Sequence, residues 1–127
     1  MKKVISTPNA PAAIGPYSQA IYANGMLFLS GQIALDPANG ELKNENIKQE
    51  TRQVLDNLSA VLKAAESDLG SVVKCSIFMS DMAHYATVNA VYSEYFIDAA
   101  PAREAMAVKG LPKGVNVEIS AIALCDA

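Results

Sequence analysis

The feature that most constrains the fold is a group of short strand-like segments that are apolar on both faces. In residues 115–124, Val117 and Ile119 point to one side of an extended strand, whereas Ile122 and Leu124 point to the other. Only two segments of the chain have helical periodicity, and two helices cover only one face of a sheet. The second face therefore needs a partner, and a closed ring of identical subunits is the usual solution.

Periodicity predicts the order ββαβαββ and an α+β fold, with one sheet and two helices packed on one face. Residues 8–16 contain three prolines and one glycine and indicate an extended loop. The predicted strands span residues 17–23, 26–30, 71–79, 103–108 and 115–124. The predicted helices follow residues 46 and 81, and each has an apolar stripe on one side.

Local signals indicate where these elements begin and end. Asn24-Gly25 is typical of a tight hairpin turn. Asn46 and Gln49 resemble a capping box at the start of the first helix, and Gly70 is a plausible stop for it. Asp81 is a suitable N-cap for the second helix.

Composition limits the possible functions. A chain of 127 residues with 51% apolar and 18% charged residues predicts one folded domain over residues 1–127 and excludes a disordered chain. The net charge is −3 and no basic run is longer than Lys2-Lys3, which argues against nucleic-acid binding. Cys75 and Cys125 are expected to be buried free thiols in a reducing compartment. Without an apolar stretch of signal or membrane-spanning length, we expect a cytoplasmic protein.

Arg103 and Glu118 are ionisable residues within apolar runs that are predicted to be neighbouring strands. Desolvation of a lone charge is costly, so the two either form a structural ion pair or face a polar cleft. A guanidinium fork is a natural receptor for a small carboxylate, and an adjacent carboxylate can activate water. The pair suggests an enzyme for a small carboxylic acid, with its site near a subunit boundary.

Other polar positions have two interpretations each. Tyr17 follows Gly15-Pro16 and is either an ordinary rim tyrosine or part of a site. Gly31, within Ser30-Gly31-Gln32, either makes a bulge or lets a ligand or another backbone segment approach closely. Asn89 lies on the second helix, where surface exposure is the simpler expectation. His84 is the only histidine and a poor metal candidate, so we predict no metal site.

Five motifs in order resemble the YjgF/Rid family of reactive intermediate deaminases, in its RidA-type branch, and the resemblance covers essentially the whole chain. They are NAPAAIGPYSQA (residues 9–20), SGQ (30–32), VNAVY (88–92), PAR (101–103) and VEISAIA (117–123). The resemblance implies a fold similar to that of a trimeric bacterial chorismate mutase, with ligand clefts between the subunits of a homotrimer.

The resemblance also implies a reaction without cofactor or metal. Family members hydrolyse 2-imino acids, the tautomers of 2-aminoacrylate or 2-aminocrotonate, to 2-keto acids and ammonia. Arg103 matches the arginine that binds the carboxylate, and Glu118 matches the glutamate that positions water. We expect Arg103 to keep Glu118 ionised. The implied catalytic residues are Arg103, Glu118 and Tyr17, and the implied substrate-binding residues are Arg103, Ser30, Gly31, Asn89 and Ala105.

One departure from the family pattern follows the arginine, where Glu104-Ala105 replaces the frequent Ser-Cys. We expect Ala105 to contribute its backbone and Glu104 to point away from Arg103, because successive strand residues alternate between faces. Two alternative functions stay open. A sensor of 2-keto acids would need Arg103 but not Glu118, and an RNA-directed inhibitor of translation is disfavoured by the acidic pI of about 5.0.

Overall fold

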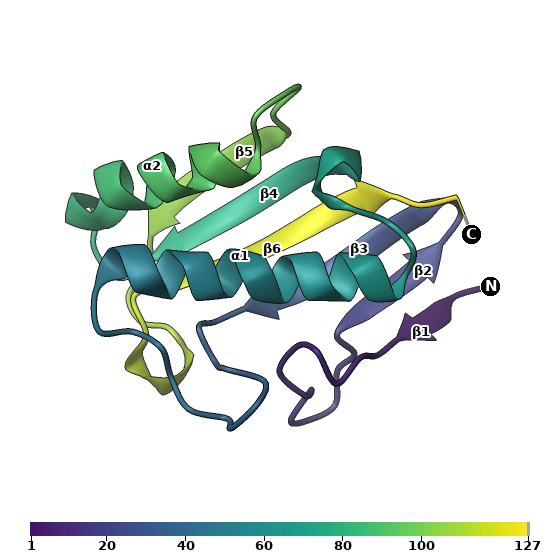
Figure 1. Ribbon diagram of the computed structural model, residues 1–127, viewed down its shortest axis with the longest axis horizontal. Coiled ribbons are helices and arrows are strands. Elements are labelled where there is room, and N and C mark those ends of the chain that lie inside the picture. Colours follow the sequence, from purple (N-terminus) through teal and green to yellow (C-terminus); the bar gives the residue numbers. More distant parts are fainter. Residues whose placement is uncertain (127) are drawn as a thin grey trace.

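The computed structural model describes residues 1–126 and contains one six-stranded mixed sheet with two helices on one face (Figure 1). The strand order is β1-β2-β3-β6-β4-β5, and only the β4–β5 pair is parallel. The strands are β1 (Lys3–Ile5), β2 (Ala20–Ala23), β3 (Met26–Gln32), β4 (Val72–Met79), β5 (Ala102–Ala107) and β6 (Val117–Leu124). The helices are α1 (Ile47–Ala64) and α2 (Tyr85–Tyr95), with short 3-10 turns η1 (Leu69–Ser71), η2 (Met82–His84) and η3 (Pro112–Gly114). The α+β prediction is confirmed, and β1 is an additional strand that periodicity did not predict.

The first helix begins where the capping box predicts it. The Asn46 side chain accepts a hydrogen bond from the Gln49 N–H at 2.8 Å, while the Gln49 side chain accepts one from the Glu45 N–H at 3.0 Å. The predicted stop at Gly70 is wrong, because α1 ends at Ala64. Glu66 takes the left-handed conformation there, with φ 60°, and the N–H groups of residues 66 and 67 bond back into the last turn.

The second helix and the hairpin also follow their local signals. The Asp81 side chain accepts a hydrogen bond from the Ala83 N–H at 2.8 Å and caps η2, which leads directly into α2. Asn24 and Gly25 both have positive φ, 52° and 75°, as a tight hairpin turn between β2 and β3 requires. The strand predicted over residues 17–23 begins only at Ala20, as β2. The residue before it, Gln19, is hydrogen-bonded to the preceding loop.

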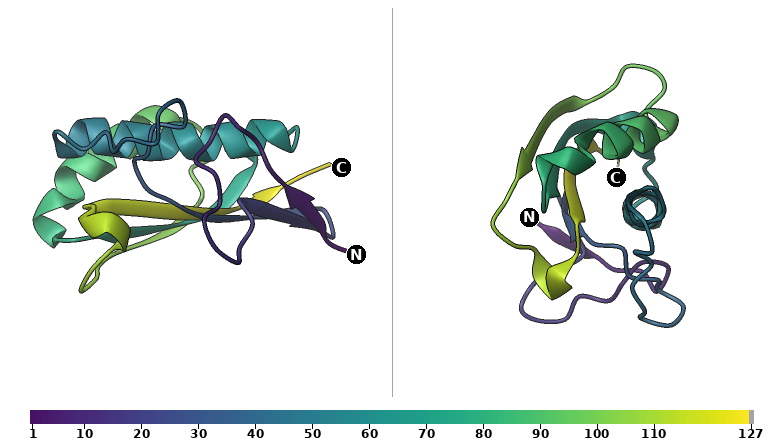
Figure 2. Two further views of the ribbon diagram at one scale, coloured as in Figure 1. Left: turned by 90° about the horizontal axis from the view of Figure 1, so that it is seen from below. Right: turned by 90° about the vertical axis from the view of Figure 1, so that its left-hand side faces the viewer.

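The core lies between the sheet and the two helices, and the opposite face of the sheet is uncovered (Figure 2). Large apolar side chains are exposed on this chain, including Phe28 at 46% and Leu124 at 52%. Alternation along β6 places Leu124 opposite the buried Ala123, and therefore on the uncovered face. Among the described residues, none of the helices is long and apolar enough to cross a membrane.

The predicted adjacency of the two strands that carry Arg103 and Glu118 is wrong. β4 lies between β5 and β6 and pairs with both. Arg103 is in register with the buried Cys75 and shares its helix-covered face, whereas Glu118 is in register with Phe78 and points to the uncovered face. The two side chains of one chain therefore lie on opposite faces of its sheet.

Candidate functional site

A cleft of about 500 Å³ opens where the proline-containing N-terminal loop, the end of β3 and the start of β6 meet. Four of the predicted site residues line it together: Tyr17, Ser30, Gly31 and Glu118. Tyr17 is 52% exposed, as a residue at the rim of an open cleft would be. Further lining residues are Pro11, Ala12, Ile14, Gln32, Ile33, Leu35, Pro112 and Lys113.

Gly31 makes room for the Glu118 carboxyl group. A Cβ at position 31 would lie 2.5 Å from Oε2 of Glu118 and 2.9 Å from its Cδ. The β3–β6 register shifts between Leu29 and Gln32, so Gly31 lies in a bulge of the sheet. Gly31 therefore lies in a bulge, as one interpretation predicts, and the group that approaches it closely is the Glu118 side chain; the close approach of a ligand stays a prediction.

Burial raises the pKa of the Glu118 carboxyl group above its usual value. The prediction that Arg103 keeps Glu118 ionised is therefore wrong within one chain, because the sheet separates the two residues. A carboxyl group in a cleft whose pKa is raised by burial holds its proton more readily than an exposed one, which is a property that proton-transfer groups of active sites often have.

Two buried or partly buried side chains hold the N-terminal wall of the cleft. Gln19 is buried; its Oε1 accepts a hydrogen bond from the Thr7 N–H at 2.7 Å, and its Nε2 donates to the Pro11 carbonyl at 2.8 Å. The Ser30 hydroxyl donates to the Ser18 carbonyl at 2.6 Å. Ser30 thus anchors the loop beside Tyr17, in addition to lining the cleft.

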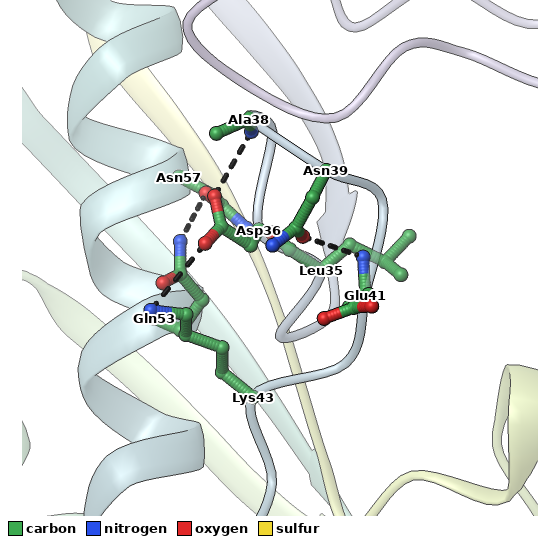
Figure 3. A network of polar contacts seen from close by, with 8 residues as sticks. All are labelled: Leu35, Asp36, Ala38, Asn39, Glu41, Lys43, Gln53 and Asn57. Carbon is green, nitrogen blue, oxygen red and sulfur yellow. Dashed lines mark hydrogen bonds and ion pairs between the residues drawn. The ribbon is translucent and has the colours of Figure 1, made fainter.

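The wall formed by residues 33–35 is fastened to α1 by Asn57 (Figure 3). Its Nδ2 donates to the carbonyls of Ile33 and Leu35 at 3.0 and 2.9 Å, and its Oδ1 accepts from Gln53. The turn that follows is closed by Asp36, whose pKa is lowered chiefly by the hydrogen bond it accepts from a backbone N–H. This wall is therefore held in place by contacts within the chain.

Glu50 fixes the start of β6, directly before Glu118. Its carboxylate is fully buried and accepts hydrogen bonds from the Asn116 N–H at 2.7 Å, the Val117 N–H at 2.8 Å and the Asn116 side-chain amide at 3.1 Å. Three donors compensate the burial of this carboxylate. The backbone that carries Glu118 is consequently anchored to α1.

Arg103 belongs to a second cluster, on the helix-covered face at the β5 edge of the sheet. Its Nη1 donates to Asn89 Oδ1 and its Nη2 to the Tyr85 hydroxyl, both at 2.7 Å. The guanidinium carbon also lies 5.6 Å from the centre of the Tyr85 ring and 5.0 Å from that of Tyr92. Asn89 is thus a contact of Arg103, and the expectation that it is merely exposed is wrong.

Arg103 has no acidic partner in the part of the chain that the structure describes. Among residues 1–126, the ion pairs of the structure involve Lys43, Arg52 and Lys74, not Arg103. Both of its hydrogen-bond partners, the Asn89 side-chain carbonyl and the Tyr85 hydroxyl, are uncharged. The guanidinium is therefore oriented without an opposing charge. A guanidinium group has the donor geometry to bind a carboxylate with two parallel hydrogen bonds, and Arg103 keeps further N–H groups beyond the two that Asn89 and Tyr85 accept.

The remaining predicted residues lie close to this second cluster or away from both. Ala105 shares the face of Arg103 on β5. Glu104 points to the opposite face, as predicted, where it accepts a hydrogen bond from Ser76 at 2.6 Å and lies 3.6 Å from Lys74 Nζ. Cys75 and Cys125 are buried free thiols, as predicted. Within residues 1–126 no cluster of three or more His, Cys, Asp or Glu side chains could hold a metal ion.

Sequence reasoning missed four residues that position the site: Gln19, Glu50, Asn57 and Tyr85. A polar side chain inside an apolar helical stripe was the available signal for Glu50 and Asn57, since such groups are buried only when they are hydrogen-bonded. Tyr85 falls within the apolar stripe of α2, which by itself indicates packing and not a site. Its spacing of four residues from Asn89 was the signal that both reach the same strand.

The fold and the two clusters define a small α+β protein with an oriented arginine that has no ion-pair partner among residues 1–126 and a separate carboxyl group in a cleft. A family profile described as Endoribonuclease L-PSP matches residues 7–125. The chain belongs to this family, the YjgF/Rid family, which confirms the resemblance found in the sequence.

Two relatives and one solved structure illustrate the match, and each is covered over more than nine-tenths of its own length. A RutC family protein of Pyrococcus horikoshii is 52% identical, over 97% of this chain and 98% of the relative. The mouse protein named 2-iminobutanoate/2-iminopropanoate deaminase is 48% identical, over 98% of this chain and 92% of the relative. Among solved structures, E. coli TdcF with bound serine is similar with a TM-score of 0.93 and 38% identity, and the match covers 98% of this chain and 99% of that one.

Proposed function

We propose that this protein hydrolyses 2-imino acids to 2-keto acids and ammonia. Relatives that carry the name 2-iminobutanoate/2-iminopropanoate deaminase are 44–48% identical to it over 98% of its length. The bound serine of TdcF supports a small carboxylic acid as the kind of ligand that this fold accepts. The carrying observation in this chain is Arg103, an oriented guanidinium whose charge no side chain of the described residues neutralises.

The two clusters complement each other, although they lie on opposite faces of the sheet. One has an unneutralised cation, and the other has a carboxyl group whose pKa is raised by burial. Arg103 lies on β5, an edge strand that pairs only with β4. We therefore infer that the site forms between subunits, where the β5 edge of one chain meets the cleft of the next, and that the uncovered apolar face is buried in a homotrimer.

In this composite site each residue has one task. Arg103 binds the substrate carboxylate and places the imine carbon in the cleft near Glu118. Water attacks the carbon of the protonated imine while the Glu118 carboxylate accepts a proton from the water, which gives a neutral carbinolamine. Glu118 returns this proton to the nitrogen, and the C–N bond breaks as the carbinolamine hydroxyl gives its proton to the Glu118 carboxylate, so that ammonia leaves and a 2-keto acid remains. Tyr17, Ser30 and Gly31 shape the cleft around the reacting carbon.

Two alternatives make different predictions. A sensor of 2-keto acids would bind through Arg103 without turnover, and one relative at 48% identity is named a putative regulator. RNA cleavage, which the family description suggests, is disfavoured by the net charge of −3, because RNA binding relies on surfaces that neutralise phosphates. We expect the protein to act in the cytoplasm, where Cys75 and Cys125 stay reduced.

The decisive experiment generates 2-aminoacrylate in situ with a serine dehydratase and follows its decay and ammonia release with and without the protein. Faster decay with the wild type and none above background with Arg103→Ala would support the proposal. Arg52→Ala is the matched control, because Arg52 pairs with Glu94 at 2.9 Å on the surface. Binding of 2-oxobutanoate without turnover in the wild type would favour the sensor.

Light scattering tests the assembly. A homotrimer of 13.4 kDa chains would have a mass of about 40 kDa, three times that of the chain. A stable monomer at micromolar concentration would contradict both the trimer and the site between subunits.

A further inference from the structure

Tyr85 is placed so that its hydroxyl and its ring both act on the Arg103 guanidinium. It is the first residue of α2, directly after the turn that Asp81 caps, and Asn89 follows one helical turn later. The two side chains reach Arg103 from the same side of the helix, and each accepts one of its N–H groups at 2.7 Å. Because these two hydrogen bonds use different nitrogens, they fix the plane of the guanidinium group before any ligand binds.

We propose that Tyr85 is a positioning residue of this site and that its hydroxyl proton is an additional donor to the substrate carboxylate. The proposal rests on the function proposed above. A phenolic hydroxyl has one proton and two acceptor lone pairs. Arg103 donates to the oxygen, and among the contacts of residues 1–126 the Tyr85 proton has no acceptor. A carboxylate oxygen bound to Nη2 would be next to that proton.

The neighbouring Tyr92 contacts the same guanidinium through its ring alone. Tyr92 also places its ring under the guanidinium, at 5.0 Å. Its hydroxyl, however, is buried beside the Cys75 thiol and accepts no hydrogen bond from Arg103, and burial is the main cause that raises its pKa. Tyr92 therefore contributes a ring to Arg103, whereas Tyr85 contributes a ring, an acceptor and an unused donor.

Tyr85→Phe removes the hydroxyl and keeps the ring, so the packing of α2 is preserved. The matched control is Tyr95→Phe, on the same helix, whose hydroxyl donates to Asp56 at 2.8 Å and not to the site. We expect Tyr85→Phe to weaken 2-oxobutanoate binding in calorimetry about 10-fold and to raise KM for imine hydrolysis similarly, with a smaller change in kcat, because hydrogen bonds to charged groups are the stronger ones. Tyr95→Phe should leave both constants unchanged.

The outcomes separate the two proposals. Wild-type Kd and KM in Tyr85→Phe would overturn the role of Tyr85 and leave the deaminase function standing. An equal loss of melting temperature and ligand affinity in both variants would also overturn it, because the effect would then be structural. A wild-type protein that neither binds 2-oxobutanoate nor hydrolyses the imine would overturn the proposed function, and the role of Tyr85 with it.

Discussion

Replacement of Gly31 by alanine should displace the Glu118 carboxyl group without unfolding the protein. The new Cβ would lie 2.5 Å from Oε2, 2.9 Å from Cδ and 3.0 Å from Cγ of Glu118. Comfortable contacts between such atoms are about 3.5 Å or more, so the carboxyl group must move by roughly 1 Å. Because the clashing atoms are the far end of a flexible side chain, a change of rotamer can relieve the clash at a cost of about 1 kcal/mol.

Activity should respond far more strongly than stability. A displacement of about 1 Å in a catalytic group costs on the order of 100-fold in rate, so we expect that loss in kcat/KM for imine hydrolysis. The assay is ammonia release from 2-aminoacrylate formed in situ, with thermal unfolding measured in parallel. Gly110→Ala is the matched control, because a Cβ there has no neighbour within 4 Å and the backbone is not in the left-handed region.

A double-mutant cycle tests the cause directly. In a Glu118→Ala background the clashing atoms are absent, so Gly31→Ala should no longer reduce thermal stability. Wild-type kcat/KM in Gly31→Ala would refute the reasoning, because it would mean either that Glu118 tolerates displacement or that it has no part in the reaction.

Three further changes address the remaining parts of the site. Glu118→Gln should keep 2-keto acid binding and lower turnover by roughly 100-fold. Because the raised pKa means that folding favours the protonated carboxyl group, stability should fall as pH rises through this pKa in the wild type, and Glu118→Gln should remove that slope in unfolding measured against pH. Arg103→Lys should lose most of its kcat/KM although the charge remains, because an ammonium cannot reproduce the fork; activity close to wild type would argue against bidentate binding. Glu50→Ala should lower the free energy of unfolding by about 3 kcal/mol, since buried backbone N–H groups lose their acceptor; a loss below about 1 kcal/mol in chemical denaturation would contradict this.

The sequence predicted the elements well where a local signal decides the structure. Asn46 and Asp81 cap as expected, because N-capping involves only neighbouring residues. The stop at Gly70 failed because Glu66 itself adopted a left-handed conformation, which periodicity does not indicate. The trimer and the assembled site stay predictions.

The relation between the two charged residues was harder to predict, because it depends on strand order. Strand alternation predicts which neighbours share a face with Arg103, and it correctly placed Glu104 on the other face. It does not predict that β4 lies between β5 and β6, because that order results from the long-range pairing of the sheet. The positions of Tyr17, Ser30, Gly31 and Glu118 in one cleft came from the family resemblance, and their grouping there is seen in the structure.

The position of β5 at the edge of the sheet has a consequence for the solubility of the chain. An edge strand offers unpaired backbone groups to other chains, and charged side chains along it discourage uncontrolled pairing. Arg103 and Glu104 occupy adjacent positions of this six-residue strand, in a segment that otherwise reads Ala, Ala, Met, Ala. We therefore expect Arg103 and Glu104 to limit aggregation of any chain whose β5 edge has no partner, so light scattering should accompany the activity assay of Arg103→Ala.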